Sequence, residues 1–312
     1  MPEQRFIFNP ESEDAWLALR KDDLTSTDIP ALFNLSPYLT LYELWYRKHD
    51  KLDIDFKVNE RAEWGNDLEP AIAKAAARKQ GWKIRPMKEY IRLMPYRLGS
   101  SFDFRIMKAD TDTHDDEMLE IKNVDFSVFH NNWIYVKEED YLEAPAHIEL
   151  QLQQQLLVAG LPVGNIAALV GGNKINYIRR EADKDIHKAI IERSQEFWRS
   201  IDEHREPEPN FELDAEVFIR MNQYAQPGSV CDLRGNDKAA ELVQISLEQA
   251  ALIKEAESKR ETCKAELLSL IGDAEKATGD GFSITAGIVG PAHVEYDRNG
   301  YRMFKINRKK LK

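Results

Sequence analysis

The stretch from Leu98 to Lys122 constrains the fold of this chain more than any other part of the sequence. It reads LGSSFDFRIMKADTDTHDDEMLEIK, in which an apolar-alternating run is followed by an acidic turn at Asp110 to Glu117 and by a second strand-like run. This order predicts a β-hairpin. Because successive side chains of a strand point to opposite faces, Glu120 and Lys122 share one face, and the leucine and isoleucine beside Glu120 point into the core.

Asp103 lies on the other strand of this predicted hairpin. If its side chain faces the same way as Glu120 and Lys122, two carboxylates and one ammonium converge, and two neighbouring carboxylates repel unless a cation lies between them. Oxygen ligands of this kind suit Mg²⁺ or Mn²⁺, and Lys122 would then hold and polarise a water for attack on phosphorus. The hairpin therefore predicts a divalent-metal site for phosphate chemistry.

A second interpretation of the acid-x-Lys triplet stays open at this point, because such triplets are common. This chain also contains Asp55-Phe56-Lys57 and Glu257-Ser258-Lys259. A charged, solvent-facing edge of a hairpin would show the same pattern. The triplet therefore needs support from the segments around it.

A long helix is predicted ahead of the hairpin, from Glu60 to Gln80. The segment is rich in alanine, runs for about five turns and is ended by Gly81. Its buried stripe is predicted to contain Leu68, Ile72, Ala73, Ala76 and Ala77. Glu69 lies near this stripe, where a carboxylate is either paired or used, and Gly65 permits close approach to the helix backbone. The alternative for Glu69 is an ordinary, partly exposed helix glutamate.

The order and spacing of these segments resemble a known family of enzymes. The series consists of Gly65-x-x-x-Glu69, Ser101-x-Asp103 and Glu120-Ile121-Lys122, followed by a glutamine-rich helix. It resembles the PD-(D/E)XK nucleases, and within them it is most similar to the YqaJ group of viral recombinases, which includes lambda exonuclease. The resemblance covers about residues 12–208.

The resemblance implies roles for residues of the predicted metal site. Glu69, Asp103, Glu120 and the backbone carbonyl of Ile121 would hold Mg²⁺, for which Mn²⁺ can substitute, and Lys122 would assist the nucleophilic water. The same resemblance places Gln151, in the predicted helix AHIELQLQQQLLVAG, against the DNA or the attacking water. A glutamine-rich helix without such a role is the alternative.

The resemblance also implies a binding pocket for the 5′-phosphate of the strand being cut. The matching residues are Arg20, Thr27, seven positions later, and Ser101, two positions before Asp103. Thr27 replaces the serine of the family, and Ser26 is the alternative hydroxyl. A guanidinium and two hydroxyls form a charge-assisted cradle for a terminal phosphate.

Composition limits the remaining possibilities. No apolar run reaches membrane-spanning length, and the N-terminus MPEQRFIFNPESED has no signal-peptide pattern. We therefore expect no membrane partner and a cytoplasmic location. For a phage- or prophage-encoded protein, this is the cytoplasm of the bacterial host. Cys231 and Cys263 are too few for a disulfide framework or a four-cysteine metal site. This excludes the iron–sulfur members of the nuclease superfamily.

The net charge of −11 argues against a protein that coats DNA without specificity. It is compatible with an enzyme that grips a short DNA segment through a local basic channel. The candidates for that channel are Arg47, Lys48 and Lys51, for which a solvated helix end is the alternative.

Periodicity predicts further helices and strands on either side of the hairpin. Residues 12–50 read as two helices separated by a turn at Ser36-Pro37, with Thr27-Asp28 as a cap. Later segments predict strands at 165–170 and 174–179, helices at 183–203 and 237–274, and a final β-hairpin with its turn at Asn299-Gly300.

The expected fold is α/β, with a PD-(D/E)XK restriction-endonuclease-like core, in which helices flank a mixed central sheet, and a C-terminal extension of a long helix and a small β-hairpin. The expected domains are a nuclease domain at residues 1–208 and the extension at 209–312.

The function implied by the resemblance is a metal-dependent deoxyribonuclease of the phage recombination type, which digests linear duplex DNA 5′ to 3′ and leaves a 3′ single strand. The implied partners are double-stranded DNA ends, further copies in a homotrimer and a single-strand annealing protein. Two alternatives remain: an endonuclease or flap nuclease on the same fold, and a DNA-end-binding protein without catalysis.

Overall fold

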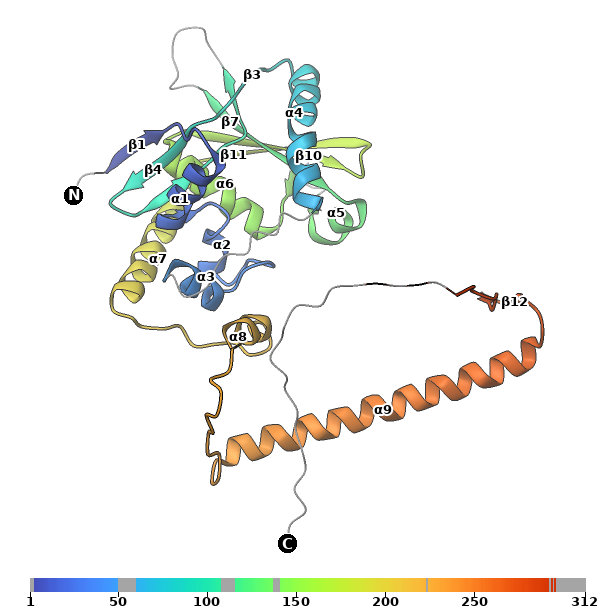
Figure 1. The fold of residues 1–312 in the computed structure, drawn as a ribbon. Coiled ribbons are helices and arrows are strands. Elements are labelled where there is room, and N and C mark those ends of the chain that lie inside the picture. The colour runs from blue at the N-terminus through green and yellow to red at the C-terminus, as the bar shows by residue number, and fades with distance from the viewer. Residues whose placement is uncertain are drawn as a thin grey trace. The chain divides into compact units, whose positions relative to one another are not determined.

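The computed structural model describes residues 3–49, 60–107, 116–136, 141–222, 224–291, 293 and 295. The chain divides into two compact units, Met1–Phe218 and Ile219–Lys312, and each is described by itself. The helices are α1 (Glu13–Asp22), α2 (Ile29–Leu32), α3 (Leu41–Lys48), α4 (Glu60–Gln80), α5 (Phe126–Asn132), α6 (Ala146–Ala159), α7 (Lys184–Asp202), α8 (Ala215–Met221) and α9 (Asp237–Ile271) (Figure 1).

The strands form two sheets and two small hairpins. They are β1 (Gln4–Phe8), β2 (Leu24–Thr25), β3 (Lys83–Pro86), β4 (Tyr90–Met94), β5 (Leu98–Ser100), β6 (Phe104–Met107), β7 (Glu117–Val124), β8 (Ile134–Val136), β9 (Tyr141–Glu143), β10 (Val163–Val170), β11 (Lys174–Glu181), β12 (Lys276–Gly279) and β13 (Phe282–Thr285). Within these described ranges, none of the helices has the length and apolar character that a membrane crossing requires.

A mixed five-stranded sheet forms the centre of the first unit. Its strand order is β11-β10-β7-β6-β3, and the middle strand β7 pairs parallel with β10 and antiparallel with β6. Helix α4 covers one face of this sheet (Figure 1). The buried cluster between them contains Ile72, Ala73 and Ala76 of α4 and Phe104, Ile106, Leu119, Ile121 and Ala167 of the sheet. The alanines let the helix approach the strands closely.

Helix α6 contacts both sheets of the first unit. The second sheet has the order β1-β4-β5-β2, and α6 contacts β4 and β5 of this sheet as well as β10 of the other. Its side chains Leu152 and Leu156 are buried. A Cβ atom at Gly164 of β10 would lie 2.9 Å from Leu152, so this glycine lets the helix pack against the strand. The polar side of α6 is thereby held near the ends of β5 and β7.

Several predicted elements are confirmed with close boundaries. Helix α4 spans the predicted residues 60–80, and its predicted stripe is buried or partly buried. Helices α6, α7 and α9 and the strands β10 and β11 also form where periodicity predicts them. The structure is a mixed α/β fold with helix-flanked sheets, as predicted at that level.

The predicted hairpin is correct only in part. Its first strand is not continuous, because β5 belongs to the four-stranded sheet and β6 to the five-stranded sheet. Ser101 and Asp103 lie in the short crossing between them. The pairing of β6 with β7 forms the hairpin itself, and most of its predicted acidic turn lies outside the described residues. Asp103 therefore stands at a sheet crossing and not within a strand.

Other predicted details also differ. Three helices form before residue 50 where two are predicted, and the predicted cap Asp28 occupies the N-cap position of α2 without a side-chain capping bond. In the second unit, β12 and β13 form a hairpin whose turn contains Gly281 at φ +83°. The predicted turn at Asn299-Gly300 lies outside the described residues.

Candidate active site

The predicted carboxylates come from three separate elements of the first unit. Glu120 and Lys122 lie on β7, Asp103 precedes β6, and Glu69 lies in α4. The register pairs Phe104 with Leu119, which places Asp103 beside Glu120 across the hairpin. One oxygen of Asp103 accepts a hydrogen bond from the backbone N–H of the next residue along β7, Ile121, at 2.7 Å. We call Glu69, Asp103, Glu120 and Lys122 the carboxylate cluster.

Glu120 is the most densely bonded member of this cluster. Its side chain is buried, and its Oε1 accepts hydrogen bonds from Lys122 Nζ at 2.7 Å and from Gln151 Nε2 at 2.6 Å. Lys122 Nζ also donates to Gln151 Oε1 at 3.1 Å. Gln155 Nε2 donates to the second oxygen of Glu120 at 2.9 Å. The structure therefore brings Gln151 and Gln155 to the acid-x-Lys triplet, and the predicted contact of Gln151 with the DNA or the attacking water stays a prediction.

The charged groups of the cluster shift one another's pKa values. Burial raises the pKa of Asp103 well above its usual range, and the nearby charges of Glu120 and Glu69 raise it further. Burial and Glu120 also raise the pKa of Glu69. Burial acts to lower the pKa of Lys122, but the surrounding carboxylates outweigh it and raise that pKa. The raised pKa favours the ammonium form of Lys122, which donates hydrogen bonds to Glu120 and Gln151.

The cluster offers donors suited to a hard cation. Asp103 and Glu69 interact unfavourably with Glu120, and a divalent cation would relieve this repulsion. Over the described residues, however, no group of three or more His, Cys, Asp or Glu side chains is arranged to hold a metal ion. The oxygens of Glu120 are bonded to Lys122 and to two glutamine amides. The donor chemistry fits Mg²⁺, and the predicted ligand set that includes the carbonyl of Ile121 stays a prediction.

The three residues predicted to bind phosphate also lie together. Arg20 Nη2 donates to Thr27 Oγ1 at 3.4 Å, and its guanidinium lies 4.5 Å from the centre of the Trp16 ring. The indole N–H of Trp16 donates to Ser101 Oγ at 2.7 Å. We call Arg20, Thr27 and Ser101 the cradle. The alternative hydroxyl, Ser26, is buried, whereas Thr27 is exposed.

The cradle and the carboxylate cluster are joined through the crossing between β5 and β6. Ser101 belongs to the cradle, and Asp103, two residues later, belongs to the cluster. Gln155 Nε2 donates to the carbonyl of Ser101 at 3.3 Å as well as to Glu120. A group bound at the cradle would therefore lie beside the acidic residues.

Sequence reasoning missed Trp16 and the role of Gln155. Both lie four residues from a predicted site residue in a helix, Trp16 before Arg20 and Gln155 after Gln151. Side chains at this spacing are neighbours on a helix surface. The spacing was therefore a usable signal in each case.

The predicted basic channel is not formed as expected. The prediction is wrong for Lys48, whose side chain is only 8% exposed and pairs with Asp28 at 3.1 Å. Arg47 pairs with Glu43 on its own helix at 2.6 Å. Lys51 lies outside the described residues.

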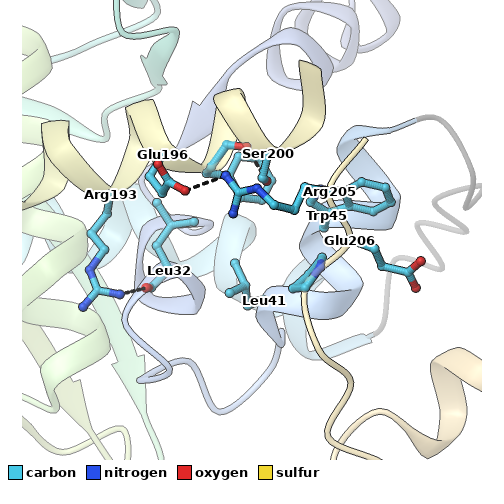
Figure 2. A pocket seen from close by; sticks show the side chains of 10 residues that line it. Leu32, Leu41, Trp45, Arg193, Glu196, Ser200, Arg205 and Glu206 are labelled. Carbon is cyan, nitrogen blue, oxygen red and sulfur yellow. Dashed lines mark hydrogen bonds and ion pairs between the residues drawn. The ribbon is translucent and has the colours of Figure 1, made fainter. Parts of the chain in front are cut away.

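A separate pocket of about 150 Å³ lies among α2, α3, α7 and residues 205–207 (Figure 2). Its polar lining groups are bonded to one another: Arg193 donates to the carbonyl of Leu32, and Arg205 pairs with Glu196 at 2.7 Å. None of the predicted site residues lines it. The pocket is therefore distinct from both the cradle and the carboxylate cluster.

Comparison with known proteins places the site within a recognised domain. Residues 15–162 match the model of the YqaJ-like viral recombinase domain. The chain is 26% identical over 277 residues to the uncharacterized protein YqaJ of Bacillus subtilis (strain 168), covering 87% of this chain and 81% of the relative. The crystal structure of the alkaline exonuclease LHK-Exo from Laribacter hongkongensis is similar with 15% identity and a TM-score of 0.48, over 66% of this chain and 98% of that chain. The crystal structure of LHK-Exo in complex with dAMP is similar with 16% sequence identity and a TM-score of 0.47, over 66% of this chain and 98% of that chain.

Proposed function

We propose, from the YqaJ-like viral recombinase domain that this chain carries at residues 15–162, that the protein is a magnesium-dependent exonuclease. It would hydrolyse one strand of linear duplex DNA from the 5′ end and leave a 3′ single strand. The observation that carries this proposal is the junction of the cradle with the carboxylate cluster, because Gln155 bonds both Ser101 and Glu120. An end-binding group and a phosphate-cleaving group are thereby adjacent.

The cradle would select and fix the DNA end. Arg20 supplies two-pronged hydrogen bonds to a terminal phosphate, and the hydroxyls of Thr27 and Ser101 supply further contacts. Holding the terminal phosphate fixes the distance to the next phosphodiester, which lowers the entropic cost of reaching the transition state. This geometry favours cleavage from an end over cleavage within a strand.

The carboxylate cluster would carry out the hydrolysis. When bound by Glu69, Asp103, Glu120 and the carbonyl of Ile121, Mg²⁺ would supply charge stabilisation for the phosphate undergoing attack. The ammonium of Lys122 would orient the attacking water by donating a hydrogen bond. Gln151 would hold Lys122 in place through their 3.1 Å hydrogen bond.

Two further parts of the proposal rest on the family resemblance alone. We propose that the enzyme works as a homotrimer on double-stranded DNA ends, and that a single-strand annealing protein takes up the 3′ strand. Sedimentation of the purified protein would test the first of these, and co-purification with the annealing protein the second.

The variant Glu120→Ala tests the assignment of the site. We expect nuclease activity on linear duplex DNA in Mg²⁺ to fall by about 10²–10³-fold or more, because charge stabilisation at the reacting phosphate is lost. Glu257→Ala is a matched control, since it alters the acid of another acid-x-Lys triplet, in α9. Retention of full activity by Glu120→Ala would show that the site is misassigned.

Substrate form tests the type of nuclease. The wild-type protein should degrade end-labelled linear duplex from the 5′ end and leave covalently closed circles intact. Cutting of closed circles would favour the endonuclease or flap-nuclease alternative. Binding of ends without any cleavage in Mg²⁺ would favour the end-binding protein without catalysis.

A further inference from the structure

Lys48 is the last residue of α3, and its ammonium lies at the C-terminal end of α1, next to the backbone of the cradle residue Arg20. Its Nζ donates hydrogen bonds to the carbonyls of Arg20, at 2.8 Å, and of Asp23, and it forms an ion pair with Asp28 at 3.1 Å. The last carbonyls of a helix lack partners within the helix and favour a nearby cation. An ammonium has three N–H donors, and these three contacts use all of them. With a side chain only 8% exposed, Lys48 is not placed to contact DNA.

Asp28 connects Lys48 to the side chains of the cradle. Its Oδ2 accepts hydrogen bonds from the backbone N–H and the hydroxyl of Thr25, both at 2.9 Å. The hydroxyl of Thr25 lies 3.1 Å from that of Thr27, which accepts a hydrogen bond from Arg20. The contacts thus run from Lys48 through Asp28, Thr25 and Thr27 to the side chain of Arg20, and return to Lys48 through the carbonyl of Arg20.

The ionic state of Asp28 supports this closed ring of contacts. Burial alone would raise its pKa, but the charge of Lys48 and the hydrogen bonds from Thr25 lower it overall. Asp28 occupies the N-cap position of α2 and yet makes no capping bond with its side chain. Its carboxylate is therefore committed to Lys48 and Thr25 and not to the helix that it precedes.

We propose that Lys48, acting through Asp28, is a positioning residue for the binding of a 5′-terminal phosphate. It fixes the backbone that carries Arg20 and the hydroxyl of Thr27, so that both face one phosphate, while Lys48 itself does not touch that phosphate. This inference rests on the proposed phosphate-binding role of the cradle. It assigns a function to a buried lysine that lies outside the carboxylate cluster.

The test compares the binding of two DNA ends without cleavage. Fluorescence anisotropy in EDTA would give the Kd of each full-length variant for a labelled linear duplex with 5′-phosphate and for the same duplex with 5′-hydroxyl ends. We expect the wild-type protein to prefer the phosphate, and Lys48→Met to reduce that preference about ten-fold, because a charge-assisted contact is displaced. Lys188→Met removes an exposed cation of α7, which pairs with Glu192 at the surface, and should leave the preference unchanged.

The ratio of the two Kd values separates positioning from folding. Loss of folded protein would weaken the apparent binding of both duplexes equally and leave their ratio intact. Asp28→Asn, which removes the ion pair and preserves the shape of the side chain, provides the second variant and should reduce the ratio in the same direction. If thermal denaturation shows that Lys48→Met is not folded, the Kd ratio of Asp28→Asn alone tests the positioning role.

Each outcome of this experiment has a defined meaning. A reduced ratio in folded Lys48→Met, or in Asp28→Asn where Lys48→Met does not fold, with Lys188→Met unchanged, supports the proposal. An unchanged ratio in folded Lys48→Met, or in Asp28→Asn where Lys48→Met does not fold, overturns it. A wild-type protein that binds both ends equally overturns the cradle and this inference with it. Failure of the nuclease proposal appears separately, as absence of cleavage by the wild-type protein in Mg²⁺.

Discussion

At the scale of single residues, Gln155 is the side chain that joins the cradle to the carboxylate cluster. It is 2% exposed, and its amide donates to Glu120 and to the carbonyl of Ser101. Its own Oε1 is buried and, among the described residues, has no hydrogen-bond partner. Replacing the Gln155 amide removes this unsatisfied acceptor, which offsets part of the stability lost with the two donated hydrogen bonds. A change at this position should therefore affect activity more than stability.

We expect Gln155→Leu to lower nuclease activity about ten-fold or more, because one buried oxygen of Glu120 loses its donor. The melting temperature should stay within a few degrees of the wild-type value, since leucine is a good helix former of similar size. Single-turnover rates in Mg²⁺ and thermal denaturation would measure the two effects. Gln244→Leu, which alters an exposed helix glutamine bonded to Glu248, is the control. Wild-type rates in Gln155→Leu would contradict the joining role of this side chain.

At the scale of elements, α6 carries both glutamines of the site, and its C-terminus is fixed from a distant strand. The helix ends at Gly160, which adopts the left-handed conformation at φ +70°. Arg5 of β1 donates from Nε to the carbonyl of Val158 at 2.9 Å and from Nη2 to that of Leu157 at 3.1 Å. These are carbonyls that the end of a helix leaves without partners. The edge strand β1 therefore caps the helix that supports the site.

We expect Arg5→Met to lower the free energy of unfolding by about 1–2 kcal/mol, because the terminal carbonyls of α6 lose a charged donor. Urea denaturation of the full chain would measure the change. Arg199→Met removes an arginine that pairs with Glu196 at the surface, and should change stability by less than about 0.5 kcal/mol. Equal effects of the two substitutions would refute the capping role.

The elements also show which parts of the fold the sequence could predict. Helices α4 and α6 were predictable because their apolar spacing and terminal glycines act within one segment. The split of the 98–107 run between two sheets was not, because it depends on pairing with β4 and β7, which lie elsewhere in the chain. Local periodicity carries no information about which sheet a strand joins.

The same distinction applies to the site. Glu120 and Lys122 were predictable as neighbours because alternation along one strand places them on the same face. The inward position of Lys48 was not, because it depends on the end of α1 and on Asp28, which belong to other elements. A basic run at the end of a helix looks identical in sequence whether it faces solvent or neighbouring backbone carbonyls.

At the scale of the whole molecule, the described residues place both sheets, the core and the candidate site in the first unit. The second unit contributes α9 and the hairpin of β12 and β13, and among its described residues nothing buries the apolar side chains of α9. We propose that the first unit alone is the nuclease. The boundary expected from the sequence, after residue 208, lies ahead of α8.

The packing at the C-terminal end of the first unit determines where the chain can be truncated without unfolding that unit. Val217 of α8 is 2% exposed, and the ring of Phe218 stacks on Tyr42 of α3 at a centroid distance of 5.0 Å. The segment before α8 is tied by Asp214, which accepts a hydrogen bond from the backbone of Asn210 at 2.7 Å. Residues 209–218 therefore belong to the packing of the first unit, and a cut after residue 221 leaves α8 whole.

We expect a chain of residues 1–221 to fold and to retain nuclease activity on linear duplex DNA, whereas a chain of residues 1–208 should be less stable by about 2–5 kcal/mol, because it loses the burial of a valine and a phenylalanine. Urea denaturation and cleavage of end-labelled duplex in Mg²⁺ would compare both with the full chain. Comparing the two shorter chains with the full chain separates unfolding from the loss of a contribution by the second unit. Unfolding would appear in the denaturation curves of the shorter chains. If the 1–221 chain is folded and yet inactive at every DNA concentration, the second unit must contribute to catalysis or to the assembly in which catalysis occurs, and the assignment of the nuclease to the first unit alone would be wrong.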